Sequence, residues 1–351
     1  MERLYLLDAY ALIYRSYYAF MGRPMRNRQG INTSAVFGFT KFLRDILMKE
    51  APRYMGVAFD PKGGTFRNEL YPQYKANRNE TPEDIVTAVP YIKRILEAMR
   101  IPCLEVPGYE ADDVIGTLAT EAGRQGITTY MMTPDKDYGQ LVSDKVFMYR
   151  PKHTGGFEVM GVEEVKAKFD IQSPAQVIDM LGLMGDSSDN IPGCPGVGEK
   201  TAQKLISEFG SIENLLEHTD QLKGALKTKV ETNREMITFS KFLATIKIDV
   251  PIQLEMDSLV REEADEDSLR SIFEELEFRT LIDRVLKKEV SGNGITSTPG
   301  SKVATGKSAP SPLPLFPEEG GGIQGDLFAN FTPNEPNEAK KSNLETLGSQ
   351  P

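Results

Sequence analysis

The sequence predicts an α/β protein with a mostly parallel sheet, followed by a helical part and a polar tail. Up to about residue 160, short apolar runs alternate with longer amphipathic ones, as strands and helices do in βαβ units. Beyond that point the strand pattern fades and short helical segments take over. From about residue 291 the chain is rich in Gly, Ser, Pro and Thr, which is typical of a flexible linker or a disordered tail.

The individual elements follow from the same patterns. Strands are expected at residues 4–7, 55–59, 128–132 and 146–149. Helices of the first part are expected at residues 33–49, 82–99, 111–123 and 136–142. Helices of the second part are expected at residues 161–169, 174–184, 198–209, 222–245 and 266–288. The chain therefore divides into an α/β part over residues 1–160, a helical part over residues 161–290 and a tail over residues 291–351.

Composition excludes several classes of protein. The 351 residues are 40% hydrophobic and 26% charged, as in an ordinary globular protein. No apolar stretch approaches the roughly 20 residues of a membrane span, and the N-terminal MERLYLLDAY places charges where a signal peptide is apolar. Two cysteines provide no disulfide framework, and the two histidines match no zinc-ligand spacing. We therefore expect a cytoplasmic protein with no membrane partner.

The distribution of charge is more informative than its total. The net charge is −10, yet residues 15–78 hold twelve Lys and Arg against four Asp and Glu. Acidic residues gather elsewhere, near residues 110, 135 and 186. A basic surface beside an acidic pocket would suit a polyanion held near metal ions, whereas an uneven solvated surface is the simpler interpretation.

Three of the predicted strands lead into aspartates. The run LYLLD ends in Asp8, MGVAFD ends in Asp60, and ITTYMMTPDKD runs into Asp135 and Asp137. The carboxyl ends of parallel strands meet at one edge of a sheet, and that edge is where ligands bind in open α/β folds. Further acids stand at a predicted helix start in GYEADDVIGTLA and in LMGDSSDNIPG.

Metal ions would explain why these acids converge. Neighbouring carboxylates repel one another, and Mg²⁺ or Mn²⁺ takes oxygen ligands and relieves that cost. Two such ions can activate a water and stabilise an in-line phosphoryl displacement. Alternatively each acid is a turn former or a helix cap, where it gains roughly 0.3–1 kcal/mol from the helix dipole. That alternative explains single acids but not three strand ends together. The candidate ligands are Asp8, Asp60, Glu110, Asp112, Asp113, Asp135, Asp137, Asp186 and Asp189.

Six motifs occur along the chain: LLDAYALIYRSYYAF, VAFD, FRNELYPQYKANR, GYEADDVIGTLA, TPDKDYGQL and GDSSDNIPGCPGVGEKTAQKLI. By these motifs, residues 3–288 resemble the 5′-nuclease domain of bacterial DNA polymerase I, a relative of phage 5′-exonucleases and flap endonucleases. Two positions depart from that family, Ala9, where Gly is frequent, and Ser187, where an acid is frequent. The resemblance implies a PIN-like, Rossmann-like sheet with a helical arch near residues 61–95, and a helix–two-turn–helix element near residues 185–210.

The resemblance also implies roles for individual residues. One metal ion would lie at Asp8, Asp60, Glu110, Asp112 and Asp135, a second at Asp137, Asp186 and Asp189, with Asp113 between them. Catalysis would depend on Asp113 and Asp135, and on Lys75 and Arg78 as a clamp for the scissile phosphate. Those two cations are three residues apart and would share one face of a helix in the arch, with Tyr74 stacking on a base. Without the resemblance, a solvated basic helix is the simpler interpretation.

The helix–two-turn–helix element would grip duplex DNA through its backbone. Glycines there expose N–H groups at a helix N-terminus, which suits phosphate, although a plain connector between helices would look the same. Contacts of this kind carry no sequence information, so specificity would be for structure. The resemblance implies a bound K⁺ and the DNA-binding residues Gly193, Gly196, Val197, Gly198, Lys200, Thr201 and Lys204.

The resemblance therefore predicts a divalent-metal-dependent 5′→3′ exonuclease and 5′-flap endonuclease. Its substrates would be DNA with flaps, nicks or ends, and RNA primers on DNA, in Okazaki-fragment maturation and DNA repair. We expect a monomer, associated with the bacterial nucleoid, that is the amino-terminal part of a longer polymerase. Two alternatives are a PIN-type ribonuclease, although such domains are much shorter, and a DNA-binding module without catalysis.

The tail contains a candidate docking peptide. QGDLF, with Gln324, Leu327 and Phe328, resembles the peptide by which bacterial polymerases bind the sliding clamp. LPLF at residues 313–316 is a weaker candidate. Incidental apolar residues in a tether would look the same.

Overall fold

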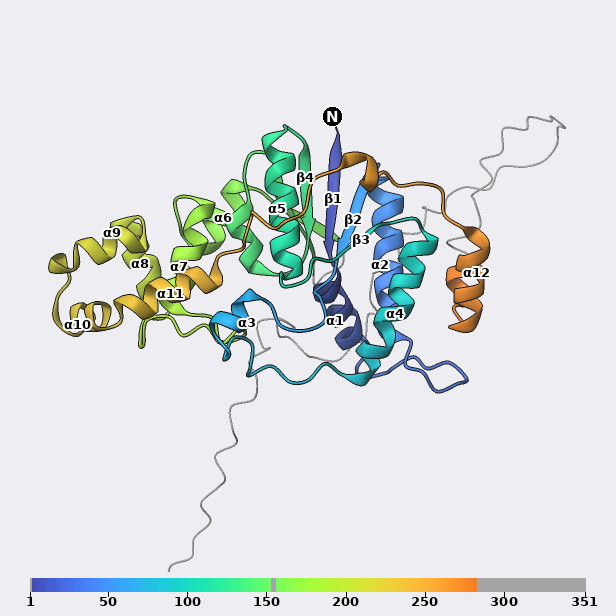
Figure 1. The fold of residues 1–351 in the computed structure, drawn as a ribbon, viewed down its shortest axis with the longest axis horizontal. Helices are drawn as coiled ribbons and strands as arrows, with labels where there is room; N and C mark the ends of the chain where they lie inside the picture. The colour runs from blue at the N-terminus through green and yellow to red at the C-terminus, as the bar shows by residue number, and fades with distance from the viewer. Residues whose placement is uncertain (1, 153–155, 283–351) are drawn as a thin grey trace, which may run out of the picture.

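The computed structural model describes residues 2–152 and 156–282 of the chain (Figure 1). Within them, six strands form one sheet in the order β3-β2-β1-β4-β5-β6. All neighbouring strands are parallel except β5 and β6, which are antiparallel, so the prediction of a mostly parallel sheet is confirmed. The strands are β1 (Arg3–Asp8), β2 (Tyr54–Ala58), β3 (Cys103–Leu104), β4 (Thr128–Met132), β5 (Val146–Pro151) and β6 (Phe157–Met160).

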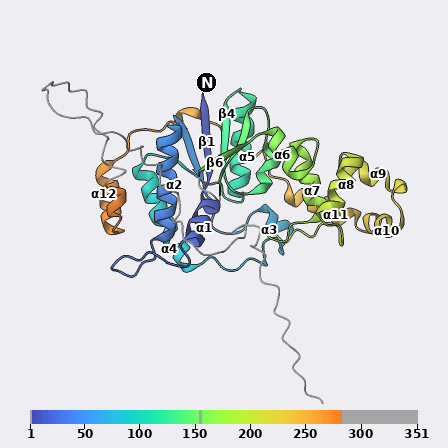
Figure 2. The ribbon, with the colours of Figure 1, turned by 180° about the vertical axis from the view of Figure 1, so that it is seen from behind.

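Helices cover both faces of this sheet (Figures 1 and 2). Side chains alternate along β1, so Leu4 and Leu6 pack in one core with α5 (Ala111–Arg124). Tyr5 and Leu7 pack in the other core, with α2 (Ser34–Glu50), α4 (Glu83–Ala98) and α12 (Glu266–Glu275). These four side chains in the middle of β1 are each at most 1% exposed. A strand buried on both faces reads as a continuous apolar run, which is why LYLL was recognisable.

Some elements were not predicted. The helix α1 (Ala9–Ala19) follows β1 directly, because the Asp8 carboxylate accepts the Ala11 N–H (3.1 Å) and caps its N-terminus. The strands β3 and β6 lie at the two edges of the sheet, and β3 has only two residues. Short edge strands carry little apolar patterning, so they leave a weak signal in a sequence.

The helical part projects from the end of the sheet (Figure 1). The predicted helix at 222–245 is two helices, since Asn233 interrupts it and donates from its side chain to Lys229 O (2.8 Å). The predicted helix at 136–142 is a 3₁₀ helix, η1 (Lys136–Leu141). The helices of this part are α6 (Val162–Phe169), α7 (Val177–Met184), α8 (Glu199–Phe209), α9 (Ile212–Glu217), α10 (Gly224–Thr232) and α11 (Arg234–Ala244). The last helix, α13 (Arg279–Leu281), adjoins α12 and packs with it in the core shared with α2 and α4.

The predicted arch over residues 61–95 is not what the structure shows. Most of its second half belongs to α4, whose Ile85, Ile92 and Ile95 are fully buried in the core shared with α2. Before α4, the chain forms the short helix α3 (Phe66–Leu70) and then turns without regular helix over residues 71–82. The region opposite the strand ends is therefore spanned by this turn segment.

Several expectations fall on residues outside the described ones. These are the last residues of the predicted helix at 266–288, the tail, and its two apolar peptides at residues 313–316 and 324–328. In the part of the chain that the structure describes, none of the helices has the length and apolar character to cross a bilayer.

Candidate metal and nucleic-acid site

The strand-end aspartates meet at the carboxyl edge of the sheet. Asp8 is the last residue of β1, while Asp60 and Asp135 follow β2 and β4, the two strands that flank β1. The strand order reverses at β1, because β2 continues on one side of it and β4 on the other. Such a switch point opens a crevice in doubly wound sheets, so the topology brings these three acids together.

Asp8 is the most enclosed of the three. Besides capping α1, its carboxylate accepts hydrogen bonds from the Thr133 hydroxyl (3.3 Å) and the Tyr138 hydroxyl (3.1 Å). Burial, and then the charge of Asp60, raise the pKa of Asp8 to about 7. The fold thus disfavours the ionised form of Asp8, a cost that a nearby cation would offset.

The start of α5 supplies the acids of GYEADD. Glu110 is the N-cap, and oxygens of Glu110, Asp112 and Asp113 lie within 4.8 Å of one another. Burial, and then the charges of Asp113 and Glu110, raise the pKa of Asp112 well above its usual range. The helix dipole favours acids here, but a contribution of about 0.3–1 kcal/mol each does not offset this repulsion.

A second group of acids comes from η1 and the loop after α7. Burial, and then the charges of Asp135 and Asp186, raise the pKa of Asp137 well above its usual range. Asp186 forms an ion pair with Lys136 (3.0 Å), and Asp189 is also an electrostatic neighbour of Asp137. The nine predicted carboxylates therefore gather in one region, as the sequence suggested.

One oxygen in this cluster fits a metal ligand particularly well. Among the described residues, Asp137 Oδ1 is a buried carboxylate oxygen without a hydrogen-bond partner. Buried polar atoms are nearly always partnered, and a carboxylate oxygen left open among other acids matches the oxygen-rich donor set of hard divalent cations. The residues present therefore fit the predicted metal ions.

The turn segment 71–78 lies against these acids and carries the predicted phosphate clamp. Lys75 forms ion pairs with Glu110 and with Asp189 (3.7 Å), and Arg78 pairs with the Asp189 carboxylate. The segment is not helical, and Lys75 has a φ of 57°, so the prediction that the two cations share a helix face is wrong. Lys75 and Arg78 instead contact the Asp189 carboxylate from consecutive turns of the chain.

The structure encloses Tyr74, for which base stacking was predicted. Its side chain is 3% exposed, and its hydroxyl lies 2.9 Å from Glu110 Oε2 and 3.2 Å from Asp189 Oδ2. A ring enclosed in this way has no face free for a base. In this conformation Tyr74 supports the acidic cluster, and stacking would require the segment to move.

Arg67, which was not predicted as a site residue, contacts the cluster directly. It is 1% exposed, forms two hydrogen bonds of 2.8 Å to the Asp113 carboxylate and a third of 2.8 Å to Glu110. It lies inside the motif FRNELYPQYKANR, yet an arginine in a short amphipathic helix resembles any solvated one. Lys136, which pairs with Asp186, was missed for the same reason.

The predicted helix–two-turn–helix residues lie between α7 and α8 and within α8 itself, and they divide into buried and accessible ones. Gly193 has a φ of 62°, and a Cβ there would lie 2.3 Å from Gly185 N, so this glycine serves internal packing. Val197 is 4% exposed, which leaves its side chain in the core. The residues at the surface or partly buried are Gly196, Gly198, Lys200, Thr201 and Lys204.

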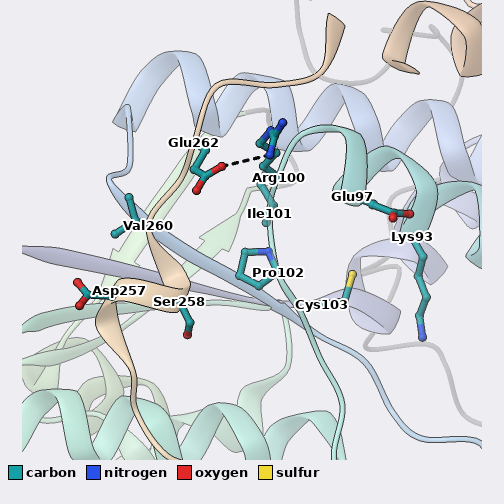
Figure 3. A pocket seen from close by; sticks show the side chains of 10 residues that line it. All are labelled: Lys93, Glu97, Arg100, Ile101, Pro102, Cys103, Asp257, Ser258, Val260 and Glu262. Atoms are coloured by element: carbon teal, nitrogen blue, oxygen red, sulfur yellow. Dashed lines mark hydrogen bonds and ion pairs between the residues drawn. The ribbon is translucent and has the colours of Figure 1, made fainter. Parts of the chain in front are cut away.

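A cavity of about 580 Å³ lies elsewhere, between the end of α4 and the segment that follows residue 256 (Figure 3). Charged residues of both signs line it, among them Lys93, Arg100 and Glu262, and the last two form an ion pair of 3.3 Å. None of the predicted site residues lines this cavity. Its mixed charge gives no indication of a ligand.

Comparison with known families agrees with the geometry. Residues 3–170 match the family model described as 5′-3′ exonuclease, N-terminal resolvase-like domain. Residues 172–267 match the model described as 5′-3′ exonuclease, C-terminal SAM fold. The two matches together account for most of the chain.

Curated relatives and solved structures were also found. DNA polymerase I of Bacillus caldotenax is 40% identical over 286 residues, which cover 81% of this chain and 32% of the relative. DNA polymerase I of Mycobacterium tuberculosis (strain H37Rv) is 38% identical over 308 residues, covering 88% of this chain and 34% of the relative. The chain therefore spans about a third of the length of these relatives.

Two solved structures share the fold. The T5 5′-exonuclease with bound zinc superimposes with a TM-score of 0.61 at 19% identity, over 78% of this chain and 99% of the other. The catalytic core of Rad2 in complex with a DNA substrate gives 0.56 at 18% identity, over 81% and 91%. These likenesses confirm the predicted fold class.

Proposed function

Since the chain belongs to the 5′-3′ exonuclease family, we propose that it hydrolyses phosphodiester bonds in DNA as a 5′→3′ exonuclease and a structure-specific 5′-flap endonuclease. One observation supports this most strongly. Carboxylates at the ends of β1, β2 and β4, at the start of α5, in η1 and in the loop after α7 converge at the edge of the sheet. Within residues 2–152 and 156–282, one buried oxygen of Asp137 has no hydrogen-bond partner. A site for DNA would not gather negative charge unless cations also bound there.

We infer that these cations are Mg²⁺ or Mn²⁺. Two such ions would supply an activated water and stabilise the charge that develops on the phosphate oxygens. Burial, and then the charges of neighbouring carboxylates, raise the pKa values of Asp112 and Asp137, and a bound cation would offset both effects, which supports this assignment. The residues that would hold the ions, directly or through water, are Asp8, Asp60, Glu110, Asp112, Asp135, Asp137, Asp186 and Asp189.

Lys75 and Arg78 would contact the scissile phosphate. In this structure Lys75 pairs with Glu110 and Arg78 pairs with Asp189, and both carboxylates are proposed metal ligands. An ammonium and a divalent ion that share one Glu110 oxygen would repel each other, so we expect Lys75 to withdraw when the site is loaded. Its charge then becomes free for the phosphate, where a positive group stabilises the transition state.

The surface around α8 would hold the duplex. Lys200 and Lys204 are exposed, and Gly198 precedes the helix, so backbone N–H groups and positive charge are available to phosphates. A K⁺ ion bound at the preceding turn would add to this contact. Binding of this kind reads backbone shape, which agrees with specificity for flaps and nicks.

We further infer a cellular role from the curated relatives, which are DNA polymerases I. Removal of RNA primers and displaced flaps, in Okazaki-fragment maturation and DNA repair, would leave a 5′-phosphate and a 3′-hydroxyl. The protein would act as a monomer near bacterial DNA. A peptide of residues 320–332 titrated with the sliding clamp would test the docking motif, and absence of binding would remove that part of the proposal.

The central test is cleavage of a labelled 5′-flap duplex with and without Mg²⁺. We expect cleavage at the flap junction that requires the ion, and a loss of at least about 100-fold in rate for Asp137→Asn. Asp144→Asn, an exposed aspartate outside the cluster, is the matched control and should keep full activity. An intact flap alongside cleaved single-stranded RNA would indicate a PIN-type ribonuclease, and binding without cleavage an inert DNA-binding module.

A further inference from the structure

We propose that Arg67 is a positioning residue of the metal site and that Asp113 is its permanent counter-ion, not a metal ligand. The pair would fix the orientation of Glu110 and join the helical part to the α/β part. This inference rests on the proposed function only in taking Glu110 and Asp112 as metal ligands.

Arg67 uses all of its hydrogen-bonding capacity inside the protein. A guanidinium has five N–H donors. Nε donates to Leu243 O (3.0 Å), and Nη1 donates to Glu110 Oε2 and Asp113 Oδ2 (both 2.8 Å). Nη2 donates to Asp113 Oδ1 and Thr245 O (both 2.8 Å). With 1% exposure and no donor left over, this side chain is not available to a substrate.

Asp113 is equally saturated. Oδ1 accepts from Arg67 Nη2 and from the Lys247 N–H (2.8 Å), while Oδ2 accepts from Arg67 Nη1 and from the Glu110 N–H (3.2 Å). Two acceptor positions on each oxygen are thereby filled, and the residue is fully buried. A metal ion would have to displace bonds from both a buried arginine and the backbone.

Asp112 directly precedes Asp113, yet its carboxylate has fewer hydrogen bonds and is less buried. Its side chain is partly exposed and accepts one bond, from the Asp113 N–H to Oδ1 (2.7 Å). Its other oxygen, Oδ2, has no hydrogen-bond partner among the described residues and is therefore open to a metal ion. Of the two adjacent aspartates, the geometry therefore assigns metal binding to Asp112 and an internal role to Asp113.

Arg67 decides which oxygen of Glu110 faces the metal site. Oε2 accepts from Arg67 and from the Tyr74 hydroxyl (2.9 Å), so both of its acceptor positions are filled. Oε1 accepts a hydrogen bond from Lys75, the cation that we expect to withdraw. With Oε2 held by a buried arginine, Glu110 presents Oε1 as a single, oriented ligand atom.

The same arginine links the two parts of the chain. Leu243 and Thr245 lie at the end of α11, which packs against α7, and the loop after α7 carries Asp186 and Asp189. Arg67 therefore ties the start of α5 to the helix that supports the second group of acids. A buried ion pair of this kind is weak evidence for stability, but it can fix one arrangement of elements.

The first test compares the adjacent aspartates by calorimetric titration with Mn²⁺ in the absence of DNA. We expect Asp113→Asn to bind the same number of ions as the wild type, with affinity reduced by at most about 10-fold and a lower Tm. Asp112→Asn should lose an ion, or at least about 100-fold in affinity, with an unchanged or higher Tm. Loss of an ion in Asp113→Asn at wild-type Tm would overturn the assignment.

The second test examines Arg67 itself. Arg67→Lys keeps the charge but not the paired bonds, so Mn²⁺ affinity should fall about 10- to 100-fold and kcat should fall, with KM for the flap substrate unchanged. Wild-type affinity and kcat in Arg67→Lys would overturn the positioning role. If Arg67→Lys does not fold, the double variant Arg67→Gln/Asp113→Asn can be measured instead, because it keeps a neutral hydrogen-bonded pair. Its Tm should be higher than that of Asp113→Asn. A lower Tm would refute the pairing of Arg67 with Asp113. A wild-type protein that binds no divalent ion would instead refute the proposed function.

Discussion

Arg67 and Lys75 neutralise the same glutamate at its two oxygens, yet the structure builds the two cations differently. Arg67 is 1% exposed, is fixed by five bonds and contacts backbone carbonyls from a distant helix. Lys75 is 22% exposed and stands in a turn, and its ammonium forms ion pairs with two carboxylates that are proposed to hold metal ions. It also lies 4.9 Å from the centre of the Tyr74 ring. A positive side chain can therefore be a fixed part of the fold, as Arg67 is, or a counter-ion that metal ions can replace, as proposed for Lys75. The difference depends on whether the carboxylates it contacts also bind metal.

The segment around Lys75 is held by polar contacts as well as by the buried Tyr74 ring. Lys75 N donates to Asp189 O (3.0 Å), and Asn190 Nδ2 donates to Gln73 O (2.7 Å). Lys75 and Asn190 have φ values of 57° and 56°, a conformation that costs of order 1 kcal/mol or more for residues other than glycine. Bonds that water can replace, together with this strain, favour local opening of the segment.

The largest expected difference between the two cations is in stability. Arg67→Ala leaves Asp113 buried without its counter-ion, so the free energy of unfolding should fall by about 3–5 kcal/mol. Lys75→Ala removes a partly exposed cation and should change it by about 1 kcal/mol or less. Urea unfolding followed by circular dichroism, at matched m-values, measures both. Equal losses would mean that Lys75 is as much a part of the fold as Arg67.

The second effect is on metal affinity and catalysis. Lys75→Gln should raise Mn²⁺ affinity in the absence of DNA by about 10-fold, because a charge-assisted bond of about 1.5 kcal/mol no longer competes at Glu110. The same variant should cleave flaps about 100-fold more slowly, since the cation for the phosphate is gone.

Calorimetric titration and single-turnover cleavage separate these two results. Lys62→Gln, an exposed lysine in the same part of the chain, is the control and should change neither. Lower Mn²⁺ affinity in Lys75→Gln would show that the ammonium helps to build the metal site and does not compete with it.

The contrast between these cations also marks how far the sequence could lead. Asp8, Asp60 and Asp135 were predictable because parallel strands end at one edge whatever the details of packing. Arg67 was not, because its role depends on the carbonyls of Leu243 and Thr245, about half the chain away. Contacts between distant segments are decided by tertiary packing, which local patterns do not report.

The non-helical form of segment 71–78 has a local cause in the sequence, the proline at position 72. Pro72 follows Tyr71, and a residue before proline avoids helical geometry. The structure gives Tyr71 a φ of −141° and a ψ of 90°, so α3 ends at Leu70. The tyrosine, lysine and arginine of the motif lie near the acids, and the prediction that they stand on a helix was wrong.

A third effect should distinguish the two cations by exchange of nearby amides. The Lys75 N–H donates to Asp189 O and the Lys247 N–H to Asp113 Oδ1 (2.8 Å), so each reports on one cation's surroundings. Saturating Mg²⁺ should speed hydrogen exchange at Lys75 by about 10-fold, because a shift of about 1.4 kcal/mol in local opening suffices. Exchange at Lys247 should not become faster. Greater protection at Lys75 with Mg²⁺ would mean that the segment closes on the ions instead of releasing them.

The smallest expected effect concerns Tyr74, which lies between the two cations. Its hydroxyl is shared by Glu110 and Asp189, so Tyr74→Phe should lower the free energy of unfolding by about 1 kcal/mol, the usual net value of such a bond. The ring is kept, so stacking on a base after the segment opens should be unaffected and flap cleavage should stay near the wild-type rate. Tyr74→Ala removes both functions and should lose cleavage as well as stability. If Tyr74→Phe instead kept its stability and lost about 100-fold in cleavage, the hydroxyl would act on the DNA, and Tyr74 would belong with Lys75 among the groups that the segment releases.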